Sequence, residues 1–169
     1  IYNSLFDQKE PFNPVREGQA SLYVCGPTVY SDSHLGHAKA YVSFDVILRY
    51  LRFCGLKTLY VQNITDVGHL MGDADEGEDK LLKRARELNQ EPMAVAESYS
   101  RRHFEAMDLL GVIRPDISPR ATGHIPEQLE AIEKLLEHGL AYESNGSDYF
   151  EITKDSKYGE LSNRKVVEM

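Results

Sequence analysis

The sequence predicts an α/β fold built on a parallel sheet, and three neighbouring segments carry that prediction. Residues 21–24 and 58–62 are rich in β-forming side chains, and the amphipathic residues 36–53 lie between them. A strand, a helix and a second strand in this order form a βαβ unit with parallel strands and a right-handed crossover. Open parallel sheets bind ligands at the carboxyl ends of their strands, so the residues that follow these two strands form the candidate site.

An irregular lead-in precedes this unit. Residues 1–19 contain Pro11, Pro14 and Gly18, which interrupt regular structure. The helix at 36–53 ends at Gly55, because glycine readily takes the left-handed conformation that terminates a helix. Its expected apolar positions, on or near one face, are Val42, Val46, Leu48 and Leu51.

Helices and a hairpin are expected in the rest of the chain. Residues 78–89 and 92–110 have helical spacing of apolar side chains, and prolines make residues 112–124 irregular. A further helix is predicted at 126–138, followed by hairpin strands at 140–143 and 148–152. The core candidates in these helices are Leu81, Leu82, Ala85, Leu88, Tyr99, Phe104, Leu109 and Leu110.

Composition limits the class of protein. The 169 residues are 41% hydrophobic and 27% charged, which suits one globular domain or one domain with part of another. A net charge of −8 makes the chain a poor nucleic-acid binder by itself. Two cysteines and no membrane-length apolar run predict a cytoplasmic protein with no membrane partner. The chain begins without Met and ends on residues typical of mid-chain, so we expect further residues on both sides.

The run His34-Leu35-Gly36-His37 stands where the first strand leads into its helix. A helix N-terminus attracts phosphate through unpaired N–H groups, and two imidazoles add hydrogen-bond donors. Gly36 has no side chain to keep a nucleotide away. Two histidines at this spacing are more often capping or surface residues, but their place after a strand end favours an ATP site for adenylyl transfer. Cys25 beside it is either a metal ligand or a small core residue.

Three blocks of sequence resemble one known family. YVCGPTVYSDSHLGH, YVQNITDVGHL and PRATGHI occur in the order found in the cysteinyl-tRNA synthetase family of class I aminoacyl-tRNA synthetases, and the resemblance covers nearly the whole chain. It implies a Rossmann-like nucleotide-binding catalytic domain, with its N-terminal half at 1–112 and the start of a connective segment at 113–169. The implied reaction is ATP-dependent activation of L-cysteine to cysteinyl-adenylate and its transfer to tRNA(Cys).

The resemblance also implies roles for single residues. His34 and His37 would contact phosphates and stabilise charge in the adenylation transition state, with ATP and magnesium as substrate. The implied ATP-contacting residues are Pro27, Thr28, Tyr30, His34, Gly36 and His37. The implied cysteine-binding residues are Gly26, Thr28 and Thr65. Cys25 is similar to the first of four zinc ligands, and the other three are expected beyond Met169. A zinc ion that binds the substrate thiolate can distinguish cysteine from serine.

Other motifs fit this interpretation less well. Lys154-Asp155-Ser156-Lys157 resembles a second ATP signature only superficially, and the true loop is expected beyond Met169, so this chain alone should not complete catalysis. The acidic residues from Asp73 to Asp79 lack the glutamate of a calcium loop. The roles of His69, Arg120 and His124 stay open.

Three rival functions remain at this point. A ligase that joins cysteine to an amino sugar in mycothiol synthesis shares the zinc-cysteine pocket and the ATP site but uses no tRNA. A small nucleotidylyltransferase also uses a histidine-glycine-histidine motif, but the Cys25-Gly26-Pro27 turn argues against it. A truncated module that only binds a partner is the non-enzymatic alternative.

Overall fold

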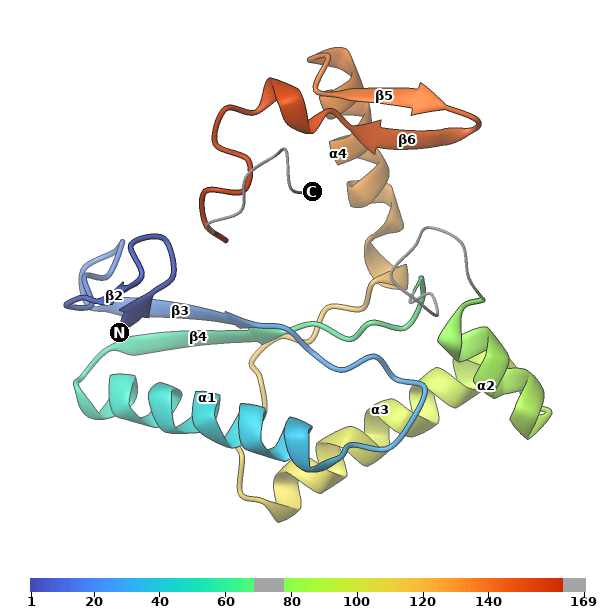
Figure 1. Ribbon diagram of the computed structural model, residues 1–169. Helices are drawn as coiled ribbons and strands as arrows, with labels where there is room; N and C mark the ends of the chain where they lie inside the picture. The colour runs from blue at the N-terminus through green and yellow to red at the C-terminus, as the bar shows by residue number, and fades with distance from the viewer. Residues whose placement is uncertain (69–77, 163–169) are drawn as a thin grey trace. The chain divides into compact units, whose positions relative to one another are not determined.

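A computed structural model describes residues 1–68 and 78–162 (Figure 1). The chain divides into two compact units, one of Pro14–His124 and one that combines Ile1–Asn13 with Ile125–Met169. The domain boundary predicted after residue 112 stays a prediction. His69 and the acidic residues Asp73, Asp75 and Glu76 lie outside the described residues.

A parallel strand pair is the centre of the first unit. Strand β3 (Gln19–Val24) pairs with β4 (Lys57–Gln62), with Gln19 opposite Lys57 and Val24 opposite Gln62, and helix α1 (Leu35–Phe53) connects them. The predicted α/β arrangement with a parallel sheet pair is therefore confirmed. Gly55, with a φ of +84°, ends the helix as expected.

Residues 116–121 contain no regular strand, in agreement with the predicted irregular structure, but they pair with β4 and the residues that follow it through isolated parallel bridges. The Gln62 N–H donates to the Ile117 carbonyl at 3.0 Å, and the Ile64 N–H donates to the Pro119 carbonyl at 2.8 Å. Isolated parallel bridges join Val61 to Ile117 and Ile64 to Arg120. Prolines hide this pairing in the sequence because they remove donors, although the carbonyl of Pro119 still accepts.

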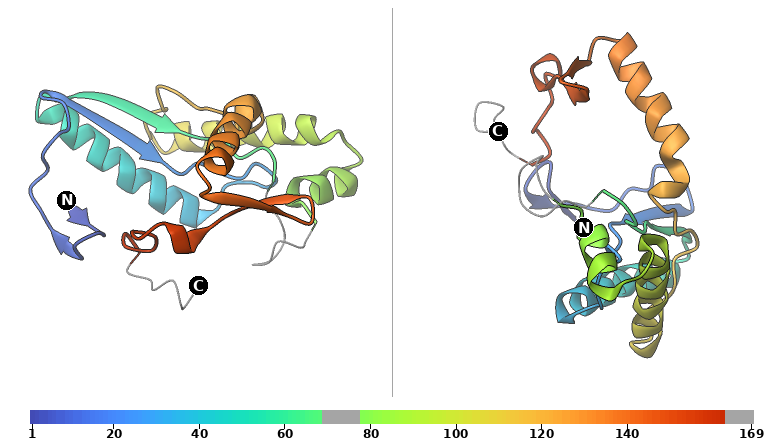
Figure 2. Two further views of the ribbon diagram at one scale, coloured as in Figure 1. Left: turned by 90° about the horizontal axis from the view of Figure 1, so that it is seen from above. Right: turned by 90° about the vertical axis from the view of Figure 1, so that its right-hand side faces the viewer.

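Two further helices complete this unit. Helices α2 (Lys80–Leu88) and α3 (Pro92–Leu109) pack against each other, and α1 and α3 lie on the same face of the β3–β4 pair (Figures 1 and 2). One core cluster joins α2 and α3 to the strand ends, and another joins α1, the strands and the end of α3. A short 3₁₀ turn, η1 (Thr122–His124), closes the unit.

Several expected core positions are exposed. Leu109 is 90% exposed and Leu110 51% exposed, because they stand at the end of α3. Leu82 and Leu88 of α2 and Val42 and Val46 of α1 are also exposed. Neighbouring elements cover a narrower stripe of each helix than the apolar pattern suggested. The buried residues of these helices are Tyr41, Leu48, Leu51, Leu81, Ala85, Val95, Ala96, Tyr99, Ser100, His103 and Met107.

The second unit contains the predicted hairpin. Helix α4 (Ile125–Glu137) precedes β5 (Ala141–Ser144) and β6 (Ser147–Phe150), and 3₁₀ turn η2 (Ile152–Lys154) follows. Asn145 and Gly146 connect the hairpin strands with positive φ values of 53° and 79°, as a type I′ turn requires. The lead-in expected to be irregular contains short antiparallel strands, β1 (Tyr2–Asn3) and β2 (Gln8–Lys9). Among the described helices, none has the length and apolar character needed to cross a membrane.

Candidate functional site

The carboxyl ends of β3 and β4 are joined by a network of backbone and side-chain bonds. The Gly26 N–H donates to Asn63 Oδ1 at 2.8 Å, and Asn63 Nδ2 donates to Thr65 Oγ1 at 3.1 Å. The Thr65 N–H donates to the Pro27 carbonyl at 3.0 Å, and Thr28 forms a parallel bridge with Thr65. The three residues suggested for cysteine binding thus lie together, although 37 positions separate Thr28 from Thr65 in sequence.

Gly26 is required by this close approach. A Cβ atom at this position would lie 1.5 Å from the Asn63 carbonyl oxygen, which is a backbone atom that cannot move aside. Pro27 is buried in the turn that follows β3. The strand ends therefore form a preorganised wall made largely of backbone.

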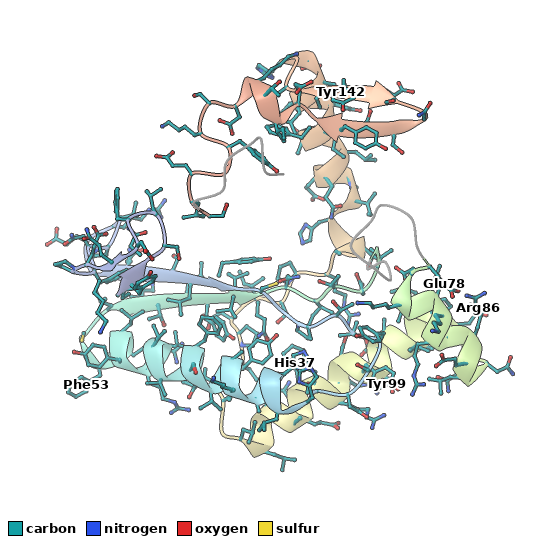
Figure 3. All side chains as sticks on the ribbon, viewed as in Figure 1. His37, Phe53, Glu78, Arg86, Tyr99 and Tyr142 are labelled. Carbon is teal, nitrogen blue, oxygen red and sulfur yellow. The ribbon has the colours of Figure 1, made fainter. Side chains whose placement is uncertain are left out.

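The two histidines of the motif cap helix α1 reciprocally. The Gly36 N–H donates to His34 Nδ1 at 3.1 Å, and the His34 N–H donates to His37 Nδ1 at 3.1 Å. This is the arrangement of a capping box, with His34 as N-cap. The rings are 4.0 Å apart between centroids, at the beginning of α1, where Figure 3 labels His37. His34 is exposed and His37 is partly exposed, so both can reach a ligand.

This cap selects one tautomer of each neutral ring. A nitrogen that accepts a backbone N–H carries no proton, so each neutral imidazole has its proton on Nε2. Burial, and then repulsion from His34, lowers the pKa of His37, which keeps this ring neutral at neutral pH. The first turn of α1 therefore presents two Nε2–H donors and its own positive end, a combination that suits a phosphate group.

Gly36 contributes to the cap in a way that sequence did not suggest. A Cβ atom here would lie 2.8 Å from Cε1 and 3.0 Å from Nδ1 of His34. The absence of a side chain therefore lets the capping imidazole lie over the first helical turn. This requirement adds to the predicted access for a nucleotide.

Tyr30 lines a pocket between the loop before α1 and helix α2. The pocket has a volume of about 490 Å³ and is lined by Tyr30, Ser31, Lys80, Lys83, Arg84 and Glu87. Lys80 Nζ lies 5.7 Å from the centroid of the Tyr30 ring, within the range of a cation–π contact. The cationic residues of α2 were not among the predicted site residues.

Residues of the third sequence block, PRATGHI, bond to Asp66, which follows the end of β4. The buried carboxylate of Asp66 accepts from the Thr122 N–H at 3.0 Å and from Thr122 Oγ1 at 2.6 Å. Arg120 bonds Glu97 at 2.7 Å and lies 3.9 Å from Asp66. Arg120 and Thr122 are thus tied into the fold, and His124 ends the 3₁₀ turn that follows.

Cys25 supplies one exposed thiol at the end of β3. The Tyr41 hydroxyl donates to its carbonyl at 3.2 Å and fixes the backbone there. Within residues 1–68 and 78–162, no group of three or more His, Cys, Asp or Glu residues is arranged to hold a metal ion. The described residues therefore do not form a tetrahedral zinc site by themselves. Cys54 is at the C-cap of α1.

One buried residue that bonds the loop directly before the histidine cap was missed by sequence analysis. His103 on α3 is 3% exposed, its Nδ1 lies 2.8 Å from Ser33 Oγ, and its ring meets Tyr41 edge-on. Burial, and then repulsion from His37, lowers the pKa of His103 to about 4. The helical spacing of Tyr99, His103 and Met107 places this histidine on the buried stripe, and this was the available signal.

The chain has extensive similarity to known proteins. A family model described as tRNA synthetases class I (C) catalytic domain matches residues 11–169. The chain is 60% identical over 168 residues to a cysteine--tRNA ligase of Chlorobaculum tepidum, covering 97% of this chain and 34% of that relative. It is 57% identical to one of Deinococcus radiodurans (98% and 33%) and 53% identical to one of Thermus thermophilus (100% and 35%). The chain thus spans about a third of the length of these curated relatives.

Proposed function

Because the chain belongs to the family of class I tRNA synthetase (C) catalytic domains, we propose that it forms the first part of a Rossmann-like domain that activates L-cysteine with ATP. The complete protein then transfers cysteine to tRNA(Cys) in the cytoplasm. The single observation that carries the proposal is the reciprocal histidine cap beside the ends of two parallel strands. The names of the relatives support cysteine and tRNA as substrates, and they do not favour an amino-sugar ligase or a small nucleotidylyltransferase.

The proposed chemistry needs no nucleophile from the protein. The cysteine carboxylate attacks the α-phosphorus of magnesium-bound ATP in line, a P–O bond forms, and pyrophosphate leaves with its electron pair. His34 and His37 donate Nε2–H to phosphate oxygens, and the N-terminus of α1 adds partial positive charge. Catalysis comes from positioning and from stabilisation of charge that develops in the transition state.

Backbone groups around Gly26, Thr28 and Thr65 line the side of this site where the amino acid binds. Their mutual hydrogen bonds hold them without a ligand, which lowers the entropy lost on binding. We assign Cys25 as one zinc ligand, with the remaining ligands outside the described residues. Bound zinc would supply a soft Lewis acid for the substrate thiolate. The hydroxyl of serine binds such an ion more weakly, so the site would favour cysteine over serine.

Cysteine-dependent exchange between ATP and pyrophosphate tests this proposal. The full-length protein should catalyse the exchange with cysteine and far less with serine. His37→Ala should lower kcat by about 10²-fold, with KM for cysteine changed by no more than about threefold, because the lost donor acts in the transition state. An equal effect of His37→Ala on cysteine binding and on kcat would contradict a role of His37 in the transition state. Absence of exchange in the wild-type protein would remove the proposed reaction.

A further inference from the structure

The loop before the histidine cap is held by adjacent residues of α3. His103 Nδ1 lies 2.8 Å from Ser33 Oγ, and Arg102 donates to Asp32 Oδ2 at 2.6 Å. Ser33 directly precedes His34, which is the N-cap of α1. Seventy residues separate each pair in the sequence, so these are contacts of the tertiary fold. The Arg102 pair is about half exposed and therefore weak, whereas His103 is buried.

The same imidazole also contacts the second turn of α1. Its ring meets Tyr41 edge-on, with centroids 5.2 Å apart, and Tyr41 in turn donates to the Cys25 carbonyl. His103 thus lies between the loop that carries His34 and the residue that fixes the end of β3. Phe104 packs edge-on against the imidazole at 5.5 Å and limits its movement.

A purely structural role does not account for a histidine here. His103 Nε2 is buried and has no hydrogen-bond partner among the described residues. Ser100 Oγ, one helical turn earlier, is likewise buried and without a partner there. An unpaired buried polar atom is destabilising, and a leucine or phenylalanine would fill the space without that cost. The feature that an apolar side chain cannot replace is the bond from Nδ1 to Ser33.

We propose that His103 is a positioning residue for the catalytic histidines. It holds Ser33, and through the backbone of Ser33 it fixes His34 as the N-cap. The reciprocal bonds of the cap then hold His37, so that both Nε2–H donors lie where a phosphate can receive them. The inference deepens the proposed function, and it rests on that function for its kinetic readout only.

Four variants of the full-length protein test this role. His103→Phe keeps the bulk and removes the bond, Ser33→Ala removes the partner without altering the core, and His103→Asn keeps a hydrogen-bonding group near the position of Nδ1. Ser43→Ala is the matched control, because it removes a serine hydroxyl of α1 whose bond stays within that helix. If His103→Phe does not fold, Ser33→Ala still tests the same bond.

The expected kinetic result is a loss of turnover without a loss of substrate affinity. His103→Phe and Ser33→Ala should each lower kcat for the exchange reaction by about tenfold, with KM for cysteine within about twofold of wild type. The double variant that combines Ser33→Ala with His103→Phe should lose no more kcat than either single variant does, because both changes break the same bond. His103→Asn should retain most of the wild-type kcat. Wild-type kcat in Ser33→Ala, or multiplied losses in the double variant, would overturn the proposal.

A second readout does not depend on the reaction. In nitrogen-15 spectra of histidine-labelled protein, His34 and His37 should show the Nε2–H tautomer in the wild type and mixed tautomers in Ser33→Ala. Unchanged tautomers in Ser33→Ala would overturn the positioning role even if kcat fell. If the wild-type protein lacks cysteine-dependent exchange, the proposed function fails, and these spectra still decide whether His103 positions the cap.

Discussion

Lowering the pH should destabilise the folded chain through His103. Burial of its imidazole, and then repulsion from His37, lowers the pKa of His103 from 6.5 to about 4. Between these values the unfolded chain binds a proton here and the folded chain does not, so the free energy of unfolding falls as the pH falls from about 6.5 to about 4. Each pKa unit is worth about 1.4 kcal/mol, so this group accounts for a loss of about 3 kcal/mol. Above about pH 6.5 the imidazole is neutral in both states and has no effect on the free energy of unfolding, and below about pH 4 its destabilising effect is complete.

Urea unfolding at pH 7.5 and pH 4.0, followed by far-ultraviolet circular dichroism, measures this loss. Other carboxylates and histidines titrate in the same range, so the informative quantity is the difference between wild type and His103→Phe. The variant should lose about 3 kcal/mol less than wild type between the two pH values. His138→Gln, which replaces an exposed histidine at the C-terminal end of α4, is the matched control variant. Equal losses in wild type and His103→Phe would refute the reasoning.

Substitutions around the strand ends give further tests. Gly26→Ala should lower the free energy of unfolding by about 3 kcal/mol or more, because its Cβ meets a backbone carbonyl, whereas Gly123→Ala, with its nearest contact at 3.9 Å, should change it by less than about 0.5 kcal/mol. Gly36→Ala should alter stability by no more than about 1 kcal/mol in thermal unfolding but lower exchange activity, since it displaces a flexible imidazole. Asp66→Ala should cost about 1–3 kcal/mol in urea unfolding, because the Thr122 N–H and the Thr122 hydroxyl both lose their buried acceptor. Cys25→Ser in the full-length protein should lower zinc content measured by atomic absorption, and unchanged content would defeat its assignment as a ligand.

Local patterns were sufficient to predict the parallel strand pair. Residues 21–24 and 58–62 combine β-forming side chains with a long helix between them, and each signal lies within one short window. Segment 116–121, which pairs with β4 through backbone bonds, could not be predicted to do so in this way. Its bonds depend on the free edge of β4, which lies more than fifty residues earlier, and its prolines argue locally against a strand.

Helix burial was predicted in part, for a related reason. Apolar spacing identified Leu48, Leu51, Leu81 and Ala85 as core residues, but it could not tell which apolar positions neighbouring elements would cover. Leu109 is apolar and nearly fully exposed, whereas His103 is polar and buried one and a half turns earlier. This difference in burial depends on contacts of α3 with α1 and with the loop before α1. No single window of sequence contains these contacts.

Histidine at the N-cap of α1 combines two requirements that commoner capping residues do not meet together. An aspartate would accept the same backbone N–H, but its negative charge would repel a phosphate at the helix N-terminus. A serine hydroxyl would also accept the backbone N–H, but it has no second polar atom on its far side to donate to a phosphate. An imidazole accepts at Nδ1 and donates from Nε2 on the opposite side of the ring, so the bond that begins the helix also selects the tautomer that binds phosphate. Substitution of either capping histidine should therefore affect stability and turnover together, whereas loss of the Ser33–His103 bond, which releases the cap only part of the time, should affect turnover more than stability.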